Sequence, residues 1–498
     1  MSQQGKNIKI FITLFLLFLS NFLIGIIFIN EGLFHYDAVV LAQAVENTYK
    51  FHKLQPAVSA RYGAVIINSI IYFPFYLLGE TADFSVRFTS VLFGSLSILA
   101  LFLFIFELTD NFFIALVTSF LFSVTPFYFS PNTYGKEHGI CNFFLFLSWF
   151  LVLKGIKKDS LFFLILSSLF FIFAISVRES TLVTVPLYFL LYFLPKVSKP
   201  FRIEFNKNSL KIKNLICFYL IFLIGFLFLF FLYLKPLFYR EFFVKDIMAV
   251  NFLGLYSPIL KTAFRDLFRA APVLLFIFSL VGFFRLLFSE NIFLPLFLFF
   301  WCCLIFYFGN LAHYVPRHLD LVIIPFYVLA SFLLRQLYSK DKFVTNLIVG
   351  YFVITMFIFM YPMLKFRHKY NGAKQFALYV KEKTPANALI IAMDDAVFIQ
   401  YYGNRKTLSH PINDYKKMHT FLRTVASYLV NGVEVYLAGS GLSYDSSGIF
   451  RGILQTNFDI KVVGSKLSED YHRPELEFTK YEQLLYKLDF KFKIKSTN

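Results

Sequence analysis

Charged side chains that could do chemistry gather where the apolar segments of this 498-residue chain end. The stretch SPNTYGKEHG places Glu137 between Lys136 and His138. Another apolar run is interrupted by the pair Arg178 and Glu179. Carboxylates beside several cations suit a site that binds an anionic group, such as a phosphate, with a base nearby.

Two further segments carry residues of the same kinds. The segment before residue 62 contains Tyr36, Asp37 and Arg61. The segment NLAHYVPRHLD contains Arg317 and His318, just before an apolar run. Ionisable residues this close to the ends of apolar helices are functional candidates by default. A positioned carboxylate can take a proton from a hydroxyl, and cations can stabilise a phosphate that gains charge as it leaves.

The composition indicates which elements must position these residues. Hydrophobic residues make up 58% of the chain, charged residues make up 16%, and the mean hydropathy is +0.64. A soluble domain is roughly half apolar and a quarter charged. The chain is therefore expected to be a polytopic membrane protein, and not a soluble enzyme, a disordered chain or a disulfide-rich module. Its net charge of +18 points to anionic lipid headgroups and not to nucleic acid.

Eleven segments are apolar and about long enough to span a bilayer, which takes about 20 residues. They lie near residues 10–30, 86–106, 112–130, 139–154, 160–177, 180–194, 215–234, 271–288, 291–309, 319–337 and 343–362. The chain becomes polar after that. We therefore predict a transmembrane catalytic domain over 1–362 and a soluble domain over 363–498.

The soluble domain has alternating patterns. Strand-like runs at 388–393, 433–438 and 459–463 alternate with helical patterns at 373–383, 415–430 and 448–455. This order predicts an α/β layer. Asp394 and Asp395 follow the first strand, where a ligand could bind, although a turn or helix cap explains them as well.

The segment 62–79 decides the topology. It is apolar, but it contains Asn68, Pro74 and three tyrosines. The basic loops at 154–158, 195–214 and 335–342 are cytoplasmic only if this segment does not cross the membrane. We therefore predict an interfacial or re-entrant helix on the outer face, an N-terminus in the cytoplasm and a C-terminal domain outside the plasma membrane. The candidate residues then share the outer face.

Five segments, in this order, resemble the GT-C superfamily of polyprenyl-phosphate-sugar-dependent glycosyltransferases, of the protein O-mannosyltransferase and lipid A aminoarabinose transferase type. They are HYDAVVLAQAVENT, ADFSVRFTSVLFGSLSILALFLF, SVTPFYFSPNTYGKEHGICNFFLFL, SVRESTLVTVPLYFL and HYVPRHLDLVIIPFYVLASFL. The resemblance covers most of the membrane domain. It implies a GT-C-like fold of about eleven spans with outer interfacial helices.

The resemblance also implies a reaction. A hydroxyl of an unknown acceptor attacks a sugar on a polyprenyl phosphate at the outer membrane face and inverts the anomeric centre. Asp37 would act as the general base, with Glu137 assisting. The expected donor-phosphate ligands are Lys136, Arg61, Arg178 and Arg317, and the further candidates for substrate contact are Tyr36, His138, Glu179 and His318.

Departures from the family pattern leave parts of this hypothesis open. Ala38 follows Asp37 where an acidic residue is common, Thr89 replaces a proline, and the stretch from Gln55 lacks the usual His-Pro-Pro. The WWDYG motif of oligosaccharyltransferase catalytic subunits is absent. No cofactor is assigned, and the sugar, the acceptor, a divalent metal and the oligomeric state stay open.

Other interpretations remain at this stage. Asp37 could be the N-cap of a helix that starts at Ala38, Glu137 could be a solvated loop residue, and Arg178 could snorkel to the interface. The loop 235–270 could be a lid over the donor or a surface helix. The alternative functions are a flippase or transporter for a lipid-linked sugar, a lipid-pyrophosphate glycan polymerase or ligase, and a membrane scaffold.

Overall fold

The computed structural model describes residues 3–57, 61–188, 190–191, 212–229, 231, 258–288, 292–308, 316–411, 415–442, 445, 448–472 and 477–491. The chain forms two compact units. The first unit contains Met1–Ile29 and Ala44–Lys365, and the second contains Asn30–Gln43 and Phe366–Asn498.

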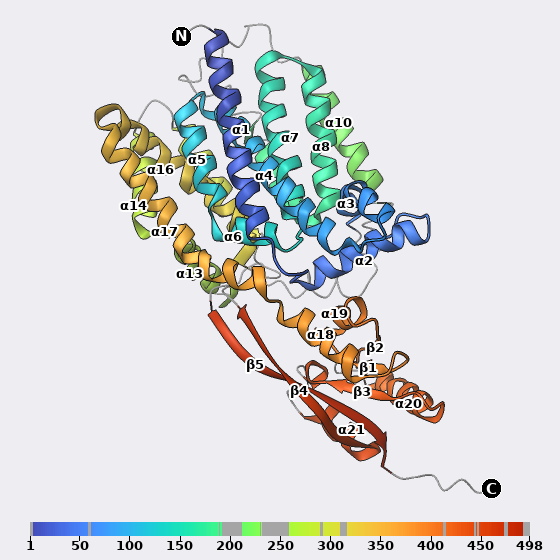
Figure 1. The fold of residues 1–498 in the computed structure, drawn as a ribbon. Coiled ribbons are helices and arrows are strands. Elements are labelled where there is room, and N and C mark those ends of the chain that lie inside the picture. The colour runs from blue at the N-terminus through green and yellow to red at the C-terminus, as the bar shows by residue number, and fades with distance from the viewer. Residues whose placement is uncertain are drawn as a thin grey trace, which may run out of the picture. The chain divides into compact units, whose positions relative to one another are not determined.

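The first unit is helical (Figure 1). In chain order its elements are α1 (Gln3–Ile27), α2 (Tyr36–Lys50, shared with the second unit), α3 (Tyr62–Leu77), α4 (Ala82–Thr109), α5 (Phe112–Ser123), α6 (Pro126–Thr133), α7 (His138–Lys158), α8 (Leu161–Val177), the 3₁₀ helix η2 (Glu179–Thr184), α10 (Ile212–Leu229), α13 (Pro258–Ala270), α14 (Val273–Leu287), α15 (Phe293–Phe308), the 3₁₀ helix η4 (Pro316–Leu319), α16 (Asp320–Lys340) and α17 (Lys342–Lys369, shared). The predicted domain boundary at residue 362 falls within α17.

Several of these helices are long and apolar enough to cross a membrane. Among the described residues, five helices meet this test, and up to seven do if each of two bent helix pairs counts as one span. The bent pairs are α5 with α6, at 56°, and α13 with α14, at 102°. The multi-pass character expected from the composition agrees with this finding, and the count of eleven spans stays a prediction.

Close helix packing in the first unit depends on glycine. Helix α4 packs against α1, α3, α5 and α7, and α7 packs against α8; Figure 1 shows α1, α4, α7 and α8 side by side. A Cβ on Gly139 of α7 would lie 2.6 Å from the backbone nitrogen of Gly94 on α4. Such small residues let two helices approach closely. The start of α7 is therefore pressed against the middle of α4.

The segment predicted as an outer interfacial helix is the helix α3. Its 16 residues span only about 24 Å, less than a bilayer core of about 30 Å. Two hydrogen bonds connect α2 to α3 and to the start of α4. Tyr49 Oη donates to the Ser69 carbonyl at 2.7 Å, and Glu46 accepts from the Ala82 amide, at the start of α4, at 2.7 Å.

The second unit contains a five-stranded sheet with the strand order β2-β1-β3-β5-β4. Its elements are α18 (Gly372–Lys383), β1 (Leu389–Ile391), α19 (Ala396–Tyr401), β2 (Lys406–Leu408), α20 (Tyr415–Val430), β3 (Val435–Ala438), the 3₁₀ helix η5 (Gly439–Leu442), α21 (Ile449–Asn457), β4 (Phe458–His472) and β5 (Glu477–Phe490). Strands β2, β1 and β3 are parallel, and β5 pairs antiparallel with both β3 and β4. The three predicted strands and three predicted helices are all present.

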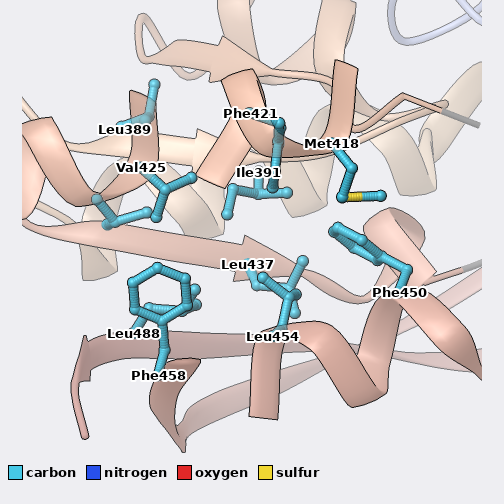
Figure 2. Close-up of a cluster of buried hydrophobic side chains, with 11 residues drawn as sticks. Leu389, Ile391, Met418, Phe421, Val425, Leu437, Phe450, Leu454, Phe458 and Leu488 are labelled. Carbon is cyan, nitrogen blue, oxygen red and sulfur yellow. The ribbon is translucent and has the colours of Figure 1, made fainter. Parts of the chain in front are cut away.

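The core of the second unit lies on this sheet. Leu389 and Ile391 of β1 and Leu437 of β3 pack with Phe421 of α20 and Leu454 of α21 (Figure 2). The alternation of strand and helix in the sequence thus buries apolar side chains against the strands. Asp395, which follows β1, is the N-cap residue of α19, although its side chain makes no capping hydrogen bond.

Candidate functional site

Arg61 joins two carboxylates from distant parts of the first unit. Its Nη1 lies 2.7 Å from Glu137 Oε1, and its Nε and Nη2 donate to the two carboxylate oxygens of Glu179 at 3.2 and 3.1 Å. The side chains of Arg61, Glu137 and Glu179 are only 15%, 4% and 21% exposed. Bidentate pairs of this kind fix the plane of the guanidinium group.

A glycine explains how Arg61 reaches this position. Arg61 is the N-cap residue of α3, and Gly63 lies in the first turn of that helix. A Cβ on Gly63 would lie 2.9 Å from Val177 Cγ2 and 3.0 Å from the Ser176 carbonyl carbon, at the end of α8. The start of α3 therefore rests on the end of α8, and Glu179 follows two residues after Val177.

The sequence Lys136-Glu137-His138 enters the cluster at the start of α7. The turn before it uses Gly135 at φ 91°, a conformation that favours glycine. Lys136, Glu137 and His138 are 1%, 3% and 2% exposed. Lys136 Nζ lies 3.9 Å from Glu137 Oε2, and the Lys136 carbonyl accepts a hydrogen bond from Ser90 of α4. The interpretation of Glu137 as a solvated loop residue is therefore wrong.

Asp320, the first residue of α16, is a member of this cluster to which sequence reasoning gave no role. It is 2% exposed. One carboxylate oxygen accepts from Asn142 Nδ2 of α7 at 2.9 Å, and the other accepts from the Leu321 amide at 2.8 Å. Its charge interacts with the guanidinium groups of Arg178 and Arg317. The Cys141 thiol of α7 lies 3.1 Å from Thr181 Oγ1 of η2, so the start of α7 also contacts the segment that follows Arg178.

The sequence contained a signal for Asp320 and for its partner Asn142, although neither was assigned a role. An aspartate as the first residue of an apolar helix is favoured by the helix dipole. The negative charge of that aspartate also explains why Arg317 can lie just before the same helix, where a cation alone is unfavourable to the helix dipole. Asn142 is a polar outlier one turn after His138 in the mostly apolar first half of α7. Neither signal names the partner, because the pairing joins segments 178 residues apart.

The charges of this cluster leave a positive excess. Arg61, Lys136, Arg178 and Arg317 supply four positive charges, and Glu137, Glu179 and Asp320 supply three negative charges when all are ionised. The sum is 4 − 3 = +1, and protonation of a carboxyl raises it. A buried cluster with a net positive charge attracts an anion such as a phosphate.

The structure thus brings together Lys136, Glu137, His138, Arg61, Arg178, Glu179 and Arg317, all of which the sequence predicted as site residues. Arg317 is 9% exposed and lies in η4, which packs against α6. His318 follows it in η4, but its side chain is outside the described residues.

Asp37 and Tyr36 lie in the second unit. Helix α2 begins at Tyr36, so Asp37 is inside the first turn and is not the N-cap of a helix that starts at Ala38. The Asp37 amide donates to His35 Nδ1 at 3.2 Å. This imidazole nitrogen of His35 also lies 3.8 Å from Asp37 Oδ2. The Asp37 side chain is 19% exposed, whereas Tyr36 is 47% exposed.

Most of the loop predicted as a lid, residues 235–257, lies outside the described residues. The remainder forms α13, in which Asp266 is flanked by Arg265 at 3.2 Å and Arg269 at 3.9 Å. In the part of the chain that the structure describes, no group of three or more His, Cys, Asp or Glu side chains is placed to hold a metal ion.

The chain is similar to known proteins in sequence and in fold. The family model of dolichyl-phosphate-mannose-protein mannosyltransferases matches residues 64–224, a range that contains Lys136, Glu137, His138, Arg178 and Glu179. No curated protein matches the chain.

Three solved structures share the fold. ArnT from Cupriavidus metallidurans bound to undecaprenyl phosphate has a TM-score of 0.61 and 10% identity, and the match covers 98% of each chain. The oligosaccharyltransferase AglB from Archaeoglobus fulgidus, in complex with an inhibitory peptide and a dolichol-phosphate, has a TM-score of 0.57 and 12% identity over 94% of this chain and 74% of that one. The Archaeoglobus fulgidus oligosaccharyltransferase in complex with Zn and sulfate has a TM-score of 0.57 and 12% identity, and the match covers 93% of this chain and 72% of that one. The predicted resemblance to GT-C glycosyltransferases is thereby confirmed.

Proposed function

We propose that this chain, which has the GT-C fold, is a membrane glycosyltransferase that moves a monosaccharide from a polyprenyl-phosphate donor to a hydroxyl group. The acceptor is a lipid, a glycan or a protein. The observation that carries the proposal is the buried cluster around Arg61, Glu137, Asp320 and Arg178, with its positive excess. The bound lipid phosphates of ArnT and AglB support a donor of this class.

The cluster suits the leaving group of such a reaction. A sugar on a lipid phosphate carries one negative charge near the phosphorus, and the phosphate gains a second as the bond to the sugar breaks. Arg178 and Arg317 are the proposed ligands of that phosphate, and Lys136 and Arg61 add positive charge. Cations fixed in a dry site stabilise developing charge more than cations in water do.

The proposed step is a single displacement. The acceptor oxygen forms a bond to the anomeric carbon while the bond from that carbon to the phosphate oxygen breaks, and the phosphate keeps the electron pair. The hydroxyl proton passes to the Asp37 carboxylate, the proposed general base, and Glu137 assists. One displacement inverts the anomeric centre. The role of Asp37 rests on the resemblance of its segment to the family motif.

The proposal includes a membrane placement. The chain crosses the plasma membrane about eleven times, with its N-terminus in the cytoplasm and the C-terminal domain from residue 363 outside. The basic loops at 154–158 and 335–342 support this orientation through the positive-inside rule. The transfer then takes place on the outer face.

Donor turnover tests the proposal. The purified full-length protein is reconstituted with a panel of polyprenyl-phosphate sugars and a membrane extract as the source of acceptor, and loss of sugar from the lipid is followed by mass spectrometry. We expect turnover of one donor, and Asp37→Asn should lower it by about 10²–10⁴-fold. Glu31→Gln is the matched control, because Glu31 lies in the same segment and pairs with Lys374 at 3.0 Å. It should retain turnover.

Each other outcome favours a different hypothesis. Turnover that survives in Asp37→Asn would move the base to Glu137. Consumption of a lipid-pyrophosphate oligosaccharide would favour a polymerase or ligase. Movement of lipid-linked sugars across the bilayer without any transfer would favour a flippase.

A second variant tests the cations that are proposed to bind the donor phosphate. Asp320→Asn keeps an acceptor oxygen for Asn142 but removes the charge that faces Arg178 and Arg317. If Asp320 positions these cations, the loss of their position outweighs the added positive charge. The KM for the donor should then rise about tenfold while kcat changes less, because the phosphate contact is made before and during the reaction. A merely structural role would lower the unfolding midpoint and leave the KM unchanged.

A further inference from the structure

We infer that a cavity in the first unit, separate from the candidate site, binds the headgroup phosphate of an anionic bilayer phospholipid. The cavity has a volume of about 610 Å³ and is formed by α1, the start of α5 and the last turns of α16. Its polar lining residues are Lys9, Asn111, Arg335, Gln336 and Ser339. The inference rests on the multi-pass arrangement and is independent of the proposed transfer reaction.

The cavity and the candidate site lie at opposite ends of α16. Asp320 is the first residue of that helix, and Ser339 comes 19 residues later. At a rise of 1.5 Å per residue the separation is about 28 Å, close to the thickness of a bilayer core. The cavity therefore lies at the headgroup level of the leaflet opposite the site.

Two cations at this cavity are available to an anion. Lys9 and Arg335 are both exposed, and Lys9 Nζ stands 4.5 Å from the centroid of the Phe112 ring. Within the described part of the chain, neither forms an ion pair with a carboxylate. Arg285 donates to Gln336, which brings a third cation to the rim.

The start of α5 adds to this attraction. The Asn111 side chain accepts a hydrogen bond from the Ile114 amide at 3.1 Å and so caps the helix. The first amides of a capped helix carry partial positive charge and bind phosphates. Basic pockets between helices at the membrane surface are the usual setting for anionic lipid headgroups.

Apolar surroundings favour a lipid over a soluble phosphate. Phe112, Phe113 and Tyr338 line the same cavity, and the rings of Phe113 and Tyr338 lie 4.7 Å apart. Phe332 of α16 also lines the cavity. A ligand with a charged head and acyl chains can satisfy both the cations and these rings.

Native mass spectrometry of the full-length protein tests the inference. Wild type and the pair variant Lys9→Gln/Arg335→Gln are titrated with phosphatidylglycerol, phosphatidylcholine and sn-glycerol 3-phosphate. The wild type should prefer phosphatidylglycerol over both other ligands. The pair variant should bind it roughly 25-fold more weakly, about fivefold for each lost cation, and Arg335→Gln alone about fivefold more weakly. The matched control Lys154→Gln/Lys158→Gln removes two cations from α7, outside the cavity, and should bind like wild type.

Three results would overturn the inference. The first is equal affinity for phosphatidylglycerol in wild type and the pair variant. The second is an equal loss in the control pair, which would indicate general surface charge. The third is binding of sn-glycerol 3-phosphate as tightly as phosphatidylglycerol, which would make the cavity a site for a soluble phosphate. Fluorescence of Trp149 and Trp301, both buried in the first unit, verifies that each variant is folded.

Discussion

Arg61 lies between two carboxylates that the chain places 42 residues apart, Glu137 and Glu179. Both carboxylates are largely removed from water, so each depends on a cation for its stability. Lys136 offers Glu137 only a distant second contact, at 3.9 Å. Arg61 therefore has a structural task in addition to its proposed role near the donor phosphate.

Replacing Arg61 with methionine should destabilise the first unit by about 3 kcal/mol, because breaking a buried ion pair leaves a charge uncompensated. The fluorescence midpoint of thermal unfolding, reported by Trp149 and Trp301, should fall by about 5 °C. Adding Glu137→Gln to Arg61→Met should recover part of this loss, since the double variant buries one charge fewer.

Arg285→Met is the matched control for Arg61→Met. Arg285, on α14 of the first unit, is exposed, and it donates to the exposed and uncharged side chain of Gln336. Contacts between exposed side chains contribute little to stability. Similar midpoints for Arg61→Met and Arg285→Met, or a double variant less stable than Arg61→Met, would contradict the role assigned to Arg61.

Sequence reasoning identified individual residues better than their partners. The type and local spacing of Lys136, Glu137 and Arg178 were enough to single them out, because ionisable groups that interrupt long apolar stretches are rare. The pairs Arg61–Glu179 and Asn142–Asp320 span 118 and 178 residues. Such contacts depend on which helices pack together, and local spacing contains no information about that packing.

At the scale of elements, the helices and strands of the second unit show what a sequence pattern can and cannot predict. The helix boundaries of α18 and α20 agree with their patterns to within one residue. Strands β2 and β5 were not predicted. β2 has only three residues, and β5 contains lysine, glutamine and glutamate among its apolar residues, because it forms a long hairpin with β4 and has side chains that face solvent.

Asp395, after β1, should make the stability of the second unit depend on pH. Burial raises the pKa of its carboxyl to about 6, although Ser440 and Gln483 act in the opposite direction. The folded state thus holds its proton more tightly than the unfolded state does. The stabilisation is complete below about pH 4 and is lost as the pH rises through 6. Asp395→Asn should flatten this dependence and make the unit more stable than wild type at pH 7.

Hydrogen exchange of peptides from 388–411 and 433–442 in the full-length protein measures this effect between pH 4 and 7.5, after correction for the chemical exchange rate. Glu434→Gln is a control of opposite sign. The Lys487 ammonium donates to Glu434 at 2.7 Å and lowers the pKa of its carboxyl, so Glu434 stabilises the fold at neutral pH and loses that effect in acid. Protection in Asp395→Asn that still falls between pH 4 and 6 as in wild type would contradict the prediction.

For the whole molecule, similarity of fold extends much further than similarity of sequence. The match to ArnT covers 98% of both chains at only 10% identity. A shared arrangement of helices at this identity indicates where a site can form, but the chemistry must come from side chains such as Glu137 and Asp320. The WWDYG motif is absent even though the fold is also that of an oligosaccharyltransferase, so the fold alone does not select the donor.

The topology can be tested at the end of α3, where a single crossing would reverse every later loop. Thr81 is exposed and precedes α4, and Lys158 is exposed at the end of α7. In a variant without the native cysteines, an impermeant thiol reagent should label Thr81→Cys only from outside the cell and Lys158→Cys only in inside-out vesicles. Helix α4 has 28 residues, about 42 Å, which is enough to cross the bilayer once. Labelling of Thr81→Cys from the cytoplasm would mean that α3 spans the membrane, and Lys136 and Arg178 would then face the cytoplasm, where the proposed outer-face reaction could not take place.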